Sequence, residues 1–172
     1  MPAMRKNVIC SRETSWLLNM VSAVMIASDP NVNSPSSSEA LEFALSSLDN
    51  AEAEYRDQSC ELDYEAIMSP DISEFAAQCG LPGVHQNALH GRYTFSVSGA
   101  NTVKSLLRKC GELTMKFAPY EVRPAYCIRL ALRVSLLAEY AASIPNVPIP
   151  NVPITGQPDT ENDSSDESDE DE

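Results

Sequence analysis

The chain has 172 residues, of which 43% are hydrophobic, so its size suits one globular domain and excludes a two-domain enzyme. It carries 12 Lys and Arg residues against 25 Asp and Glu residues, which gives a formal net charge of −13. No stretch reaches about 18 uninterrupted apolar residues, so no transmembrane helix is expected. The five cysteines include no CxxC pair, so reduced thiols are expected and no zinc site is predicted.

The charges are distributed unevenly along the chain. Residues 29–74 hold twelve acids and one base, whereas residues 92–133 hold eight bases and two acids. Residues 156–172 hold nine acids and no base. The overall negative charge therefore does not exclude nucleic-acid binding, because a basic segment can create a positive electrostatic potential over its own part of the surface.

Residues 1–11 are predicted to be a flexible N-terminus, followed by a helical core over residues 12–143. The apolar run at 16–27 predicts an amphipathic helix, and a secretory signal peptide is the less favoured interpretation because Arg12 and Glu13 adjoin the run. The face that 3.6-residue spacing predicts to be buried consists of Trp16, Leu17, Met20, Val24 and Ala27.

The acidic segment is predicted to be helical. A helix is expected over residues 39–56, capped by Ser37 or Ser38, with an apolar stripe on one face and acids on the other. A second, weak helix is expected over 62–68. A third is expected to start at Ser69, with Pro70 in its first turn, and to end at Gly80 in a left-handed cap.

The basic segment is predicted to contain one strand and two helices. Residues 92–98 alternate between apolar and polar side chains, which is typical of a strand. A helix is expected from Asn101 or Thr102 to Lys116, and a last, deeply buried helix from about Tyr120 to 142. The predicted fold is therefore an all-α helical bundle with one short strand or hairpin.

The last part of the chain is predicted to lie outside this bundle. Residues 144–155 contain two copies of IPNVP, which favours an extended proline-rich linker. Residues 156–172 are acidic with almost no apolar side chains, which predicts a disordered tail. Three serines in this tail fit sites of acid-directed kinases, namely Ser164, Ser165 and Ser168.

The basic segment is the main candidate site. Stripes of bases four residues apart on two helices would attract a phosphate backbone without reading bases, and nearby aromatic rings would stack on them. The alternative interpretation is that these bases pair with the acidic face of residues 39–74, within one protomer or between neighbours. The bases are Arg92, Lys104, Arg108, Lys109, Lys116, Arg123, Arg129 and Arg133, and the aromatic candidates are Tyr93, Phe95, Tyr120 and Tyr126.

Catalysis has little support in the sequence. Cys79 precedes His85 and His90, and a Cys–His pair is a possible nucleophile, but no acidic orienting residue or oxyanion motif accompanies them. No glycine-rich phosphate-binding motif occurs. We therefore expect a non-enzymatic protein with no cofactor, no metal and no small-molecule substrate.

Residues 93–126 resemble the coat-protein core of filamentous plant RNA viruses, over about a fifth of the chain. The matching pieces are Leu107-Arg108-Lys109-Cys110 and Met115-Lys116-Phe117-Ala118-Pro119. The resemblance implies a capsid protein of the virion and host cytoplasm that assembles with copies of itself and coats single-stranded RNA. It implies Lys104, Arg108 and Arg123 as the leading phosphate contacts, followed by Lys116 and Arg129.

The mode of assembly and an alternative function both remain open in the sequence. An open filament needs head-to-tail contacts, and the acidic helix of one copy meeting the basic helix of the next is one candidate. The alternative function is an acidic-tailed interaction or regulatory protein of the cytoplasm or nucleus. Its partner would be basic, such as a histone-like or ribosomal surface.

Overall fold

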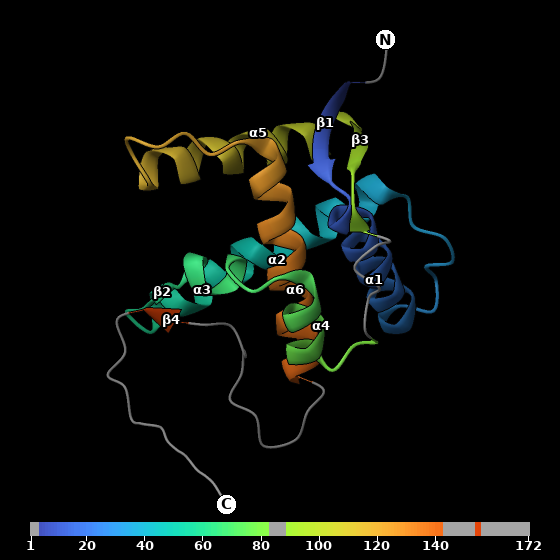
Figure 1. Cartoon of the computed structure of the whole chain (residues 1–172), viewed down its shortest axis with the longest axis horizontal. Helices are drawn as coiled ribbons and strands as arrows, with labels where there is room; N and C mark the ends of the chain where they lie inside the picture. The colour runs from blue at the N-terminus through green and yellow to red at the C-terminus, as the bar shows by residue number, and fades with distance from the viewer. Residues whose placement is uncertain (1–3, 83–88, 143–153, 156–172) are drawn as a thin grey trace, which may run out of the picture.

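The structure is a computed structural model that describes residues 4–82, 89–142 and 154–155. The described chain is mostly helical, as predicted, with small antiparallel sheets. Figure 1 shows the other helices arranged around α6 (Pro124–Ala142), which runs through the middle of the molecule. These helices are α1 (Glu13–Ser28), α2 (Ser37–Asp57), α3 (Tyr64–Met68), α4 (Ile72–Cys79) and α5 (Ala100–Lys116).

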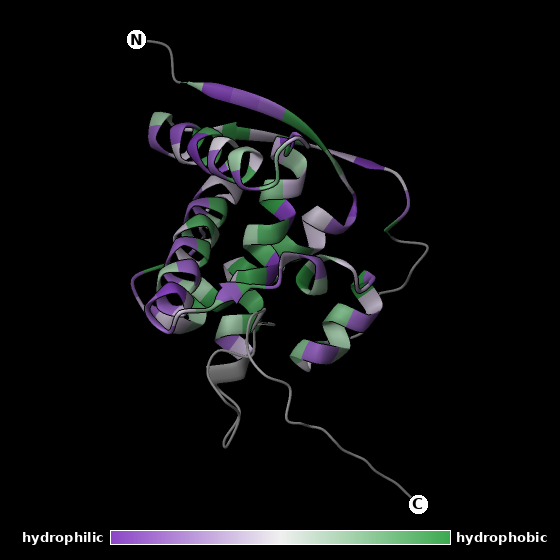
Figure 2. Ribbon diagram, turned by 90° about the vertical axis from the view of Figure 1, so that its left-hand side faces the viewer, coloured by the Kyte–Doolittle hydropathy of each residue, from purple (hydrophilic) through white to green (hydrophobic). Residues whose placement is uncertain are grey.

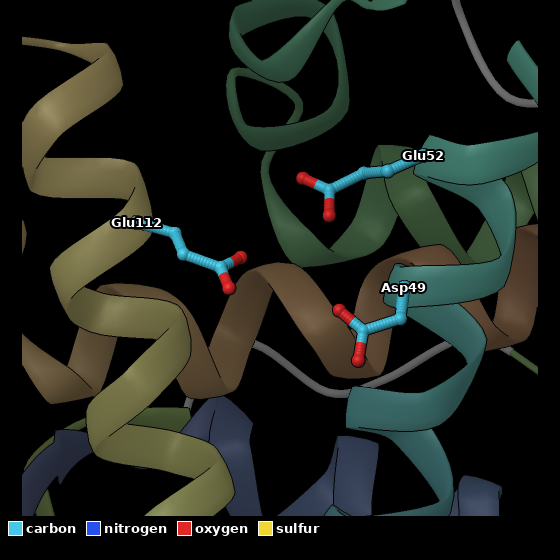
Figure 3. Close-up of side chains that lie close together, drawn as sticks. All are labelled: Asp49, Glu52 and Glu112. Carbon is cyan, nitrogen blue, oxygen red and sulfur yellow. The ribbon is translucent and has the colours of Figure 1, made fainter. Parts of the chain in front are cut away.

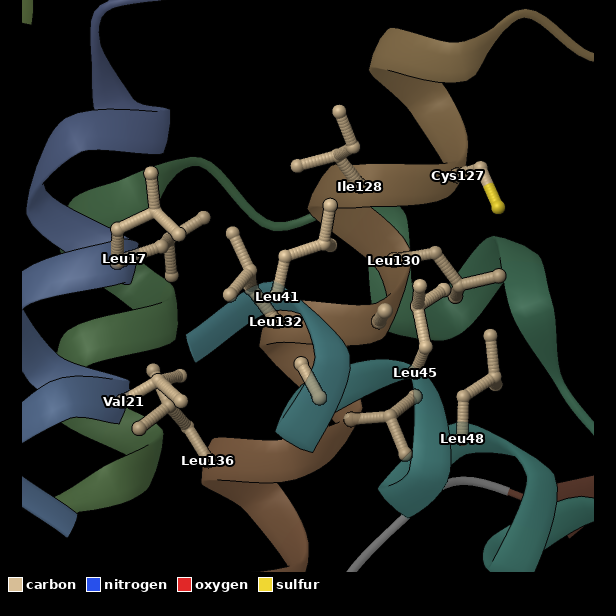
Figure 4. Packing of buried hydrophobic residues seen from close by; sticks show 14 of the residues in the cluster. Leu17, Val21, Leu41, Leu45, Leu48, Cys127, Ile128, Leu130, Leu132 and Leu136 are labelled. Carbon is tan, nitrogen blue, oxygen red and sulfur yellow. The ribbon is translucent and has the colours of Figure 1, made fainter. Parts of the chain in front are cut away.

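Helix α6 is the centre of the hydrophobic core, as its sequence predicted. Every residue from Leu130 to Leu137 is buried, so α6 has no polar outer face along this stretch. Figure 4 shows side chains from α1 and α2 converging on it. The labelled contributors are Leu17 and Val21 from α1, Leu41, Leu45 and Leu48 from α2, and Cys127, Ile128, Leu130, Leu132 and Leu136 from α6.

The surrounding helices are amphipathic. Most helices in Figure 2 carry both hydrophilic and hydrophobic colours, consistent with one face on the core and one in solvent. In α1 the buried face is rotated from the predicted one. Leu18 and Val21 are buried, whereas Ala27, expected inside, is exposed. No helix in the described ranges is both long and apolar enough to span a membrane.

The predicted flexibility of residues 1–11 is wrong for residues 5–11. These residues form strand β1 (Arg5–Ser11), which pairs antiparallel along its whole length with β3 (Arg92–Ser98). Val8 lies opposite Phe95, and both are buried. The two strands are far apart in sequence, so no turn motif between them predicts the pairing. Strand β3 therefore belongs to a sheet formed with a distant segment and not to a hairpin.

The helix starts differ from the predicted ones by a few residues. Ser36, not Ser37 or Ser38, caps α2 in a reciprocal capping box with Glu39. Asp71, not Ser69, caps α4, and Gly80 ends it with φ 70°, in the left-handed cap expected from the sequence. The predicted side-chain cap of α5 is absent, because the helix starts directly after Gly99.

A second small sheet joins β2 (Glu61–Leu62) to β4 (Ile154–Thr155). This pairing returns the chain to the start of α3 after the end of α6 (Figure 1). The rest of the predicted linker and the whole predicted acidic tail, with its three candidate serines, lie outside the described residues.

Candidate nucleic-acid interface

Arg108, a leading candidate for phosphate binding, is ion-paired within its own chain. Its guanidinium donates to Asp49 Oδ2 on α2 at 2.9 Å and to Glu112 Oε2, one turn further along α5, at 2.7 Å. About half of the side chain remains exposed. These hydrogen bonds raise the pKa of Arg108 above its usual value. Arg108 thus anchors α5 to α2, and a phosphate would have to compete with Asp49 and Glu112 for its guanidinium.

Its neighbour Lys109 points the other way and is only 2% exposed. Its Nζ lies 2.6 Å from Asp49 Oδ1, 2.6 Å from Glu52 Oε1 and 3.0 Å from Glu112 Oε1. Figure 3 shows these three carboxylates turned toward one another from α2 and α5. Such a group would suit a cation, but the Lys109 ammonium already provides the positive charge there.

The protonation states in this cluster follow from the balance of burial and charge. Burial alone would raise the pKa of Asp49, but hydrogen bonds from Lys109 and Arg108 lower it below its usual value. The pKa of Glu112 is lowered in the same way. Burial alone would lower the pKa of Lys109, but its three carboxylate partners raise it. Asp49, Glu112 and Lys109 are therefore charged at neutral pH, and their ion pairs hold α5 against α2.

Two further basic residues of α6 share one acid of α1. Arg133 is 1% exposed and lies 3.1 Å from Glu13 Oε2, while Arg129 Nε lies 3.9 Å from the same oxygen. Arg133 also donates to the backbone oxygens of Ile67 and Pro70. The predicted common face of Arg129 and Arg133 is therefore confirmed, but Arg133 is enclosed in the protein interior.

The remaining candidates differ in their exposure and in their partners. Lys116 Nζ is 3.0 Å from Glu61 Oε1 and 5.8 Å from the centre of the Tyr64 ring. Lys104 on α5 and Arg123 before α6 are exposed and make no ion pair with another described residue. The nominated bases therefore do not line one continuous stripe, and several follow the alternative of pairing with the acidic segment.

A groove of about 850 Å³ does bring two of the nominated bases together. Arg123 and Arg129 lie in its wall, with Glu65 and Glu121 as the acids of the same lining. The groove is formed by α3, by the segment that joins α5 to α6, and by the first turns of α6. Its other lining residues are Tyr64, Met68, Ser69, Phe117, Tyr120, Val122, Ala125 and Tyr126.

Aromatic rings make up much of this groove. Tyr64 and Phe117 meet edge to face, with ring centres 5.2 Å apart and planes at 82°. The Tyr64 hydroxyl donates to Glu52, which links the groove wall to the Lys109 cluster. Burial and this carboxylate raise the pKa of Tyr64, and burial raises the pKa of Tyr126, so both phenols stay neutral and remain hydrogen-bond donors.

The four aromatic candidates for base stacking fall into two groups. Tyr120 and Tyr126 line the groove, and Tyr120 is 75% exposed. Phe95 was wrongly expected to be accessible: it is 1% exposed, because it faces the core from β3. Tyr93, half-buried on the same strand, packs against Phe95 with ring centres 6.0 Å apart and lies outside the groove.

The candidate Cys–His pair gains no support from the geometry. Cys79 is buried, and burial raises the pKa of its thiol to about 12, so the thiol is protonated at neutral pH. His90 is exposed, and His85 lies outside the described residues.

Sequence reasoning missed the part of the groove that α3 supplies. Tyr64 follows Asp63, which caps α3, and no pattern in the sequence connects this short helix with the start of α6. The burial of Lys109 was also missed. Comparisons with protein-family models, with curated proteins and with solved structures find no match for the chain.

Proposed function

We propose that this chain is a structural RNA-coating protein that binds the backbone of single-stranded RNA without sequence specificity, in the groove between α3 and the start of α6. The proposal rests on one observation: Arg123 and Arg129 share a groove with the exposed ring of Tyr120 and the half-buried ring of Tyr126. Guanidinium groups beside accessible aromatic rings suit a strand whose phosphates and unstacked bases alternate.

The two arginines would have different tasks. Arg123 is exposed and makes no ion pair with another described residue, so phosphate can bind it without breaking a contact. Arg129 is about one-third exposed, and its contact with Glu13 is long at 3.9 Å, so it can exchange that partner at little cost. Glu65 and Glu121 repel phosphate from the remaining rim, which favours a defined path for the strand.

Base stacking would supply the sequence-independent part of the affinity. Tyr120 projects into solvent and offers a ring face, while Tyr126 lies deeper in the groove and is held by its surroundings. Every base has a π face, so such rings bind nucleotides without selecting among them. A duplex hides these faces, so single strands should bind better than duplexes.

The proposal is tested by fluorescence anisotropy with a short labelled single-stranded RNA, titrated with the full chain at several salt concentrations. Each phosphate contact contributes a slope of about −0.7 to log K against log salt for single strands. Arg123→Ala should make the slope shallower by about 0.7. Tyr120→Ala should weaken binding by about 5- to 150-fold while keeping the wild-type slope, because stacking does not release counterions.

Lys104→Ala is the matched control. Lys104 is also exposed and unpaired among the described residues, but it lies on α5 outside the groove. It should retain wild-type affinity and slope. Wild-type binding in Arg123→Ala and Tyr120→Ala, or equal loss in Lys104→Ala, would argue against the groove as the RNA site.

The alternative function, capture of a basic partner by an acidic interaction protein, also has an observation in its favour. Arg108, Lys109, Lys116 and Arg133 are paired with carboxylates, which reduces the positive surface available to nucleic acid. This alternative predicts no measurable RNA affinity in the wild type. It also predicts that removal of residues 156–172 abolishes capture of a histone-like or ribosomal peptide without unfolding the core.

A further inference from the structure

The antiparallel pair of β1 and β3, here called the ribbon, brings together basic residues from two distant parts of the chain. Arg5 lies opposite Ser98 at one end of the ribbon, and Arg92 lies opposite Ser11 at the other end. Arg12 follows Ser11 directly, so it lies at the same end as Arg92. All three arginines are exposed, and none makes an ion pair with another described residue. We call Arg5, Arg12 and Arg92 the ribbon arginines.

No acid accompanies the ribbon arginines on either strand. Residues 4–12 and 89–111 contain no Asp or Glu. Glu13 follows Arg12 in the chain, but its carboxylate is turned toward the buried Arg133, at 3.1 Å. Like charges without counter-charges repel one another and do not stabilise a subunit. Ion pairing within the described part of the chain therefore does not explain these arginines.

Acids of α2 bound this basic surface at one end only. Glu39 and Glu42 line a hollow together with Ser98. Glu39 accepts a hydrogen bond from the backbone N–H of Ser36 at 2.7 Å, and Glu42 accepts one from the Thr102 hydroxyl at 2.9 Å. The positive potential should therefore be strongest at the opposite end of the ribbon, where two of the ribbon arginines meet.

The outer face of the ribbon between its arginines is mostly small and polar. Its side chains are exposed and share one face, because they lie opposite one another across the two strands. Serine, threonine and asparagine commonly contact the phosphates and sugars of nucleic acids. Ile9 is the one apolar member of this set, which is too little for insertion into a membrane. The set consists of Asn7, Ile9, Ser11, Thr94 and Ser96.

The two strands offer no ring on which a base could stack. Tyr93 and Phe95 alternate with the outer residues of β3, so Tyr93 is half-buried and Phe95 is buried. A nucleic acid would therefore meet the ribbon through its backbone, and affinity should follow the density of phosphate charge. A double helix carries one charge per about 1.7 Å of its axis, about twice the density of one strand. The ribbon therefore suits a double helix, whereas the groove needs unstacked bases.

The ribbon is also separate from the groove in space. Figure 1 shows the ribbon and α3 on opposite sides of α6. None of the described residues that line the groove belongs to β1 or β3. Arg5 and Arg92 are six residue steps apart along the ribbon, which corresponds to about 20 Å. This length allows contacts with several phosphates at once.

We propose that the outer face of the ribbon binds the phosphate backbone of a nucleic-acid double helix through Arg5, Arg12 and Arg92. The ribbon reads no bases, so binding is independent of sequence. The chain then has one surface for paired segments of a nucleic acid and another, the groove, for unpaired segments. The ribbon carries this inference by itself and does not depend on the function proposed for the groove.

The proposal is tested by fluorescence anisotropy with short labelled duplexes of RNA and of DNA, titrated with the full chain at several salt concentrations. The wild type should bind a duplex, and comparison of the two duplexes shows which kind of helix supplies the phosphates. Arg5→Ala and Arg92→Ala should each weaken duplex binding about tenfold. On DNA, each should also make the slope of log K against log salt shallower by about 0.9.

Three kinds of control make the test specific. Arg5→Lys and Arg92→Lys should keep the wild-type slope, because the number of released counterions follows the charge. Arg56→Ala removes another exposed arginine, which lies on α2 outside the ribbon and makes no ion pair with another described residue. It should bind the duplex like the wild type. Tyr120→Ala, which removes a ring of the groove, should do the same.

Four outcomes would overturn the proposal. The first three are a wild type that binds neither duplex, alanine variants that keep the wild-type slope, and an equal loss of duplex binding in Tyr120→Ala and Arg92→Ala. The fourth is binding to phosphatidylserine vesicles that needs the ribbon arginines while duplexes do not bind, which would assign the surface to a membrane. Single-strand binding tests the groove separately, so failure of one surface leaves the other untouched.

Discussion

Arg133 on α6 and Glu13 on α1 form a buried ion pair, with Nη2 3.1 Å from Oε2, between residues 120 positions apart in the sequence. The same guanidinium donates to the backbone oxygens of Ile67 and Pro70 and lies 4.9 Å from the centre of the Phe75 ring. One side chain thus ties α6 to α1, to α3, to the segment between α3 and α4, and to α4 itself.

We expect Glu13→Ala to destabilise the fold by about 3 kcal/mol or more, because it leaves a buried guanidinium without its counter-charge. Burial already lowers the pKa of Arg133, which shows how strongly this environment disfavours an uncompensated charge. Urea unfolding at neutral pH measures the change. Arg129→Ala is the control: it removes the longer, more exposed contact with Glu13 and should change stability by less than about 1 kcal/mol.

The Lys109 cluster gives a prediction with a pH signature. Lys109→Met removes the ammonium that contacts Glu52 and leaves Asp49 and Glu112 with the more exposed Arg108 guanidinium, so we expect a loss of about 3 kcal/mol at neutral pH. The expected loss of stability is at the lower end of the range for broken buried ion pairs, because the side chains of Asp49 and Glu112 are 38% and 49% exposed.

The dependence on pH should differ between the two proteins. In the wild type, Lys109 and Arg108 lower the pKa of Asp49 and Glu112. The stabilisation that these ion pairs give is therefore present above the unfolded pKa of about 4, and it is lost as the pH falls through the lower folded pKa values. In Lys109→Met the carboxylates repel one another, so protonation relieves the folded state. Urea unfolding between neutral and acidic pH should therefore show the two stabilities converging. A constant difference would contradict this account.

The helices were predictable because their signals are local. Apolar residues recur at helical spacing in α2 and crowd every face of α6, and Gly80 ends α4 as its sequence indicated. Lys109 illustrates the limit of this reasoning. It was counted with its neighbour Arg108 as a surface base, and only the packing of α5 on α2 decides which of the two turns inward.

The candidate site depended on contacts that no local pattern records. The sequence predicted a basic segment with accompanying aromatic residues, and Arg123, Arg129, Tyr120 and Tyr126 do lie together. Tyr64 joins them from another segment because α3 packs against α6, a contact between residues far apart in the chain. Sequence periodicity cannot show which distant segments become neighbours, so the groove itself could not be predicted.

Strand β1 gives a direct test of a region that looked unstructured. Val8 is 6% exposed and lies opposite Phe95, whereas its neighbour Asn7 is exposed. Val8→Ala should lower the free energy of unfolding by about 2 kcal/mol, through lost burial and incomplete filling of the space. Asn7→Ala should change it by less than about 0.5 kcal/mol. Equal, negligible effects in urea unfolding would show that the strand contributes nothing to the fold.

Gly111 gives a local test of the stability of α5. Gly111→Ala should raise the free energy of unfolding by up to about 1 kcal/mol, since the position is helical, exposed and open to a Cβ atom. Gly80→Ala is the matched opposite: its φ of 70° is left-handed, so the same substitution should destabilise the fold. Urea unfolding measures both changes.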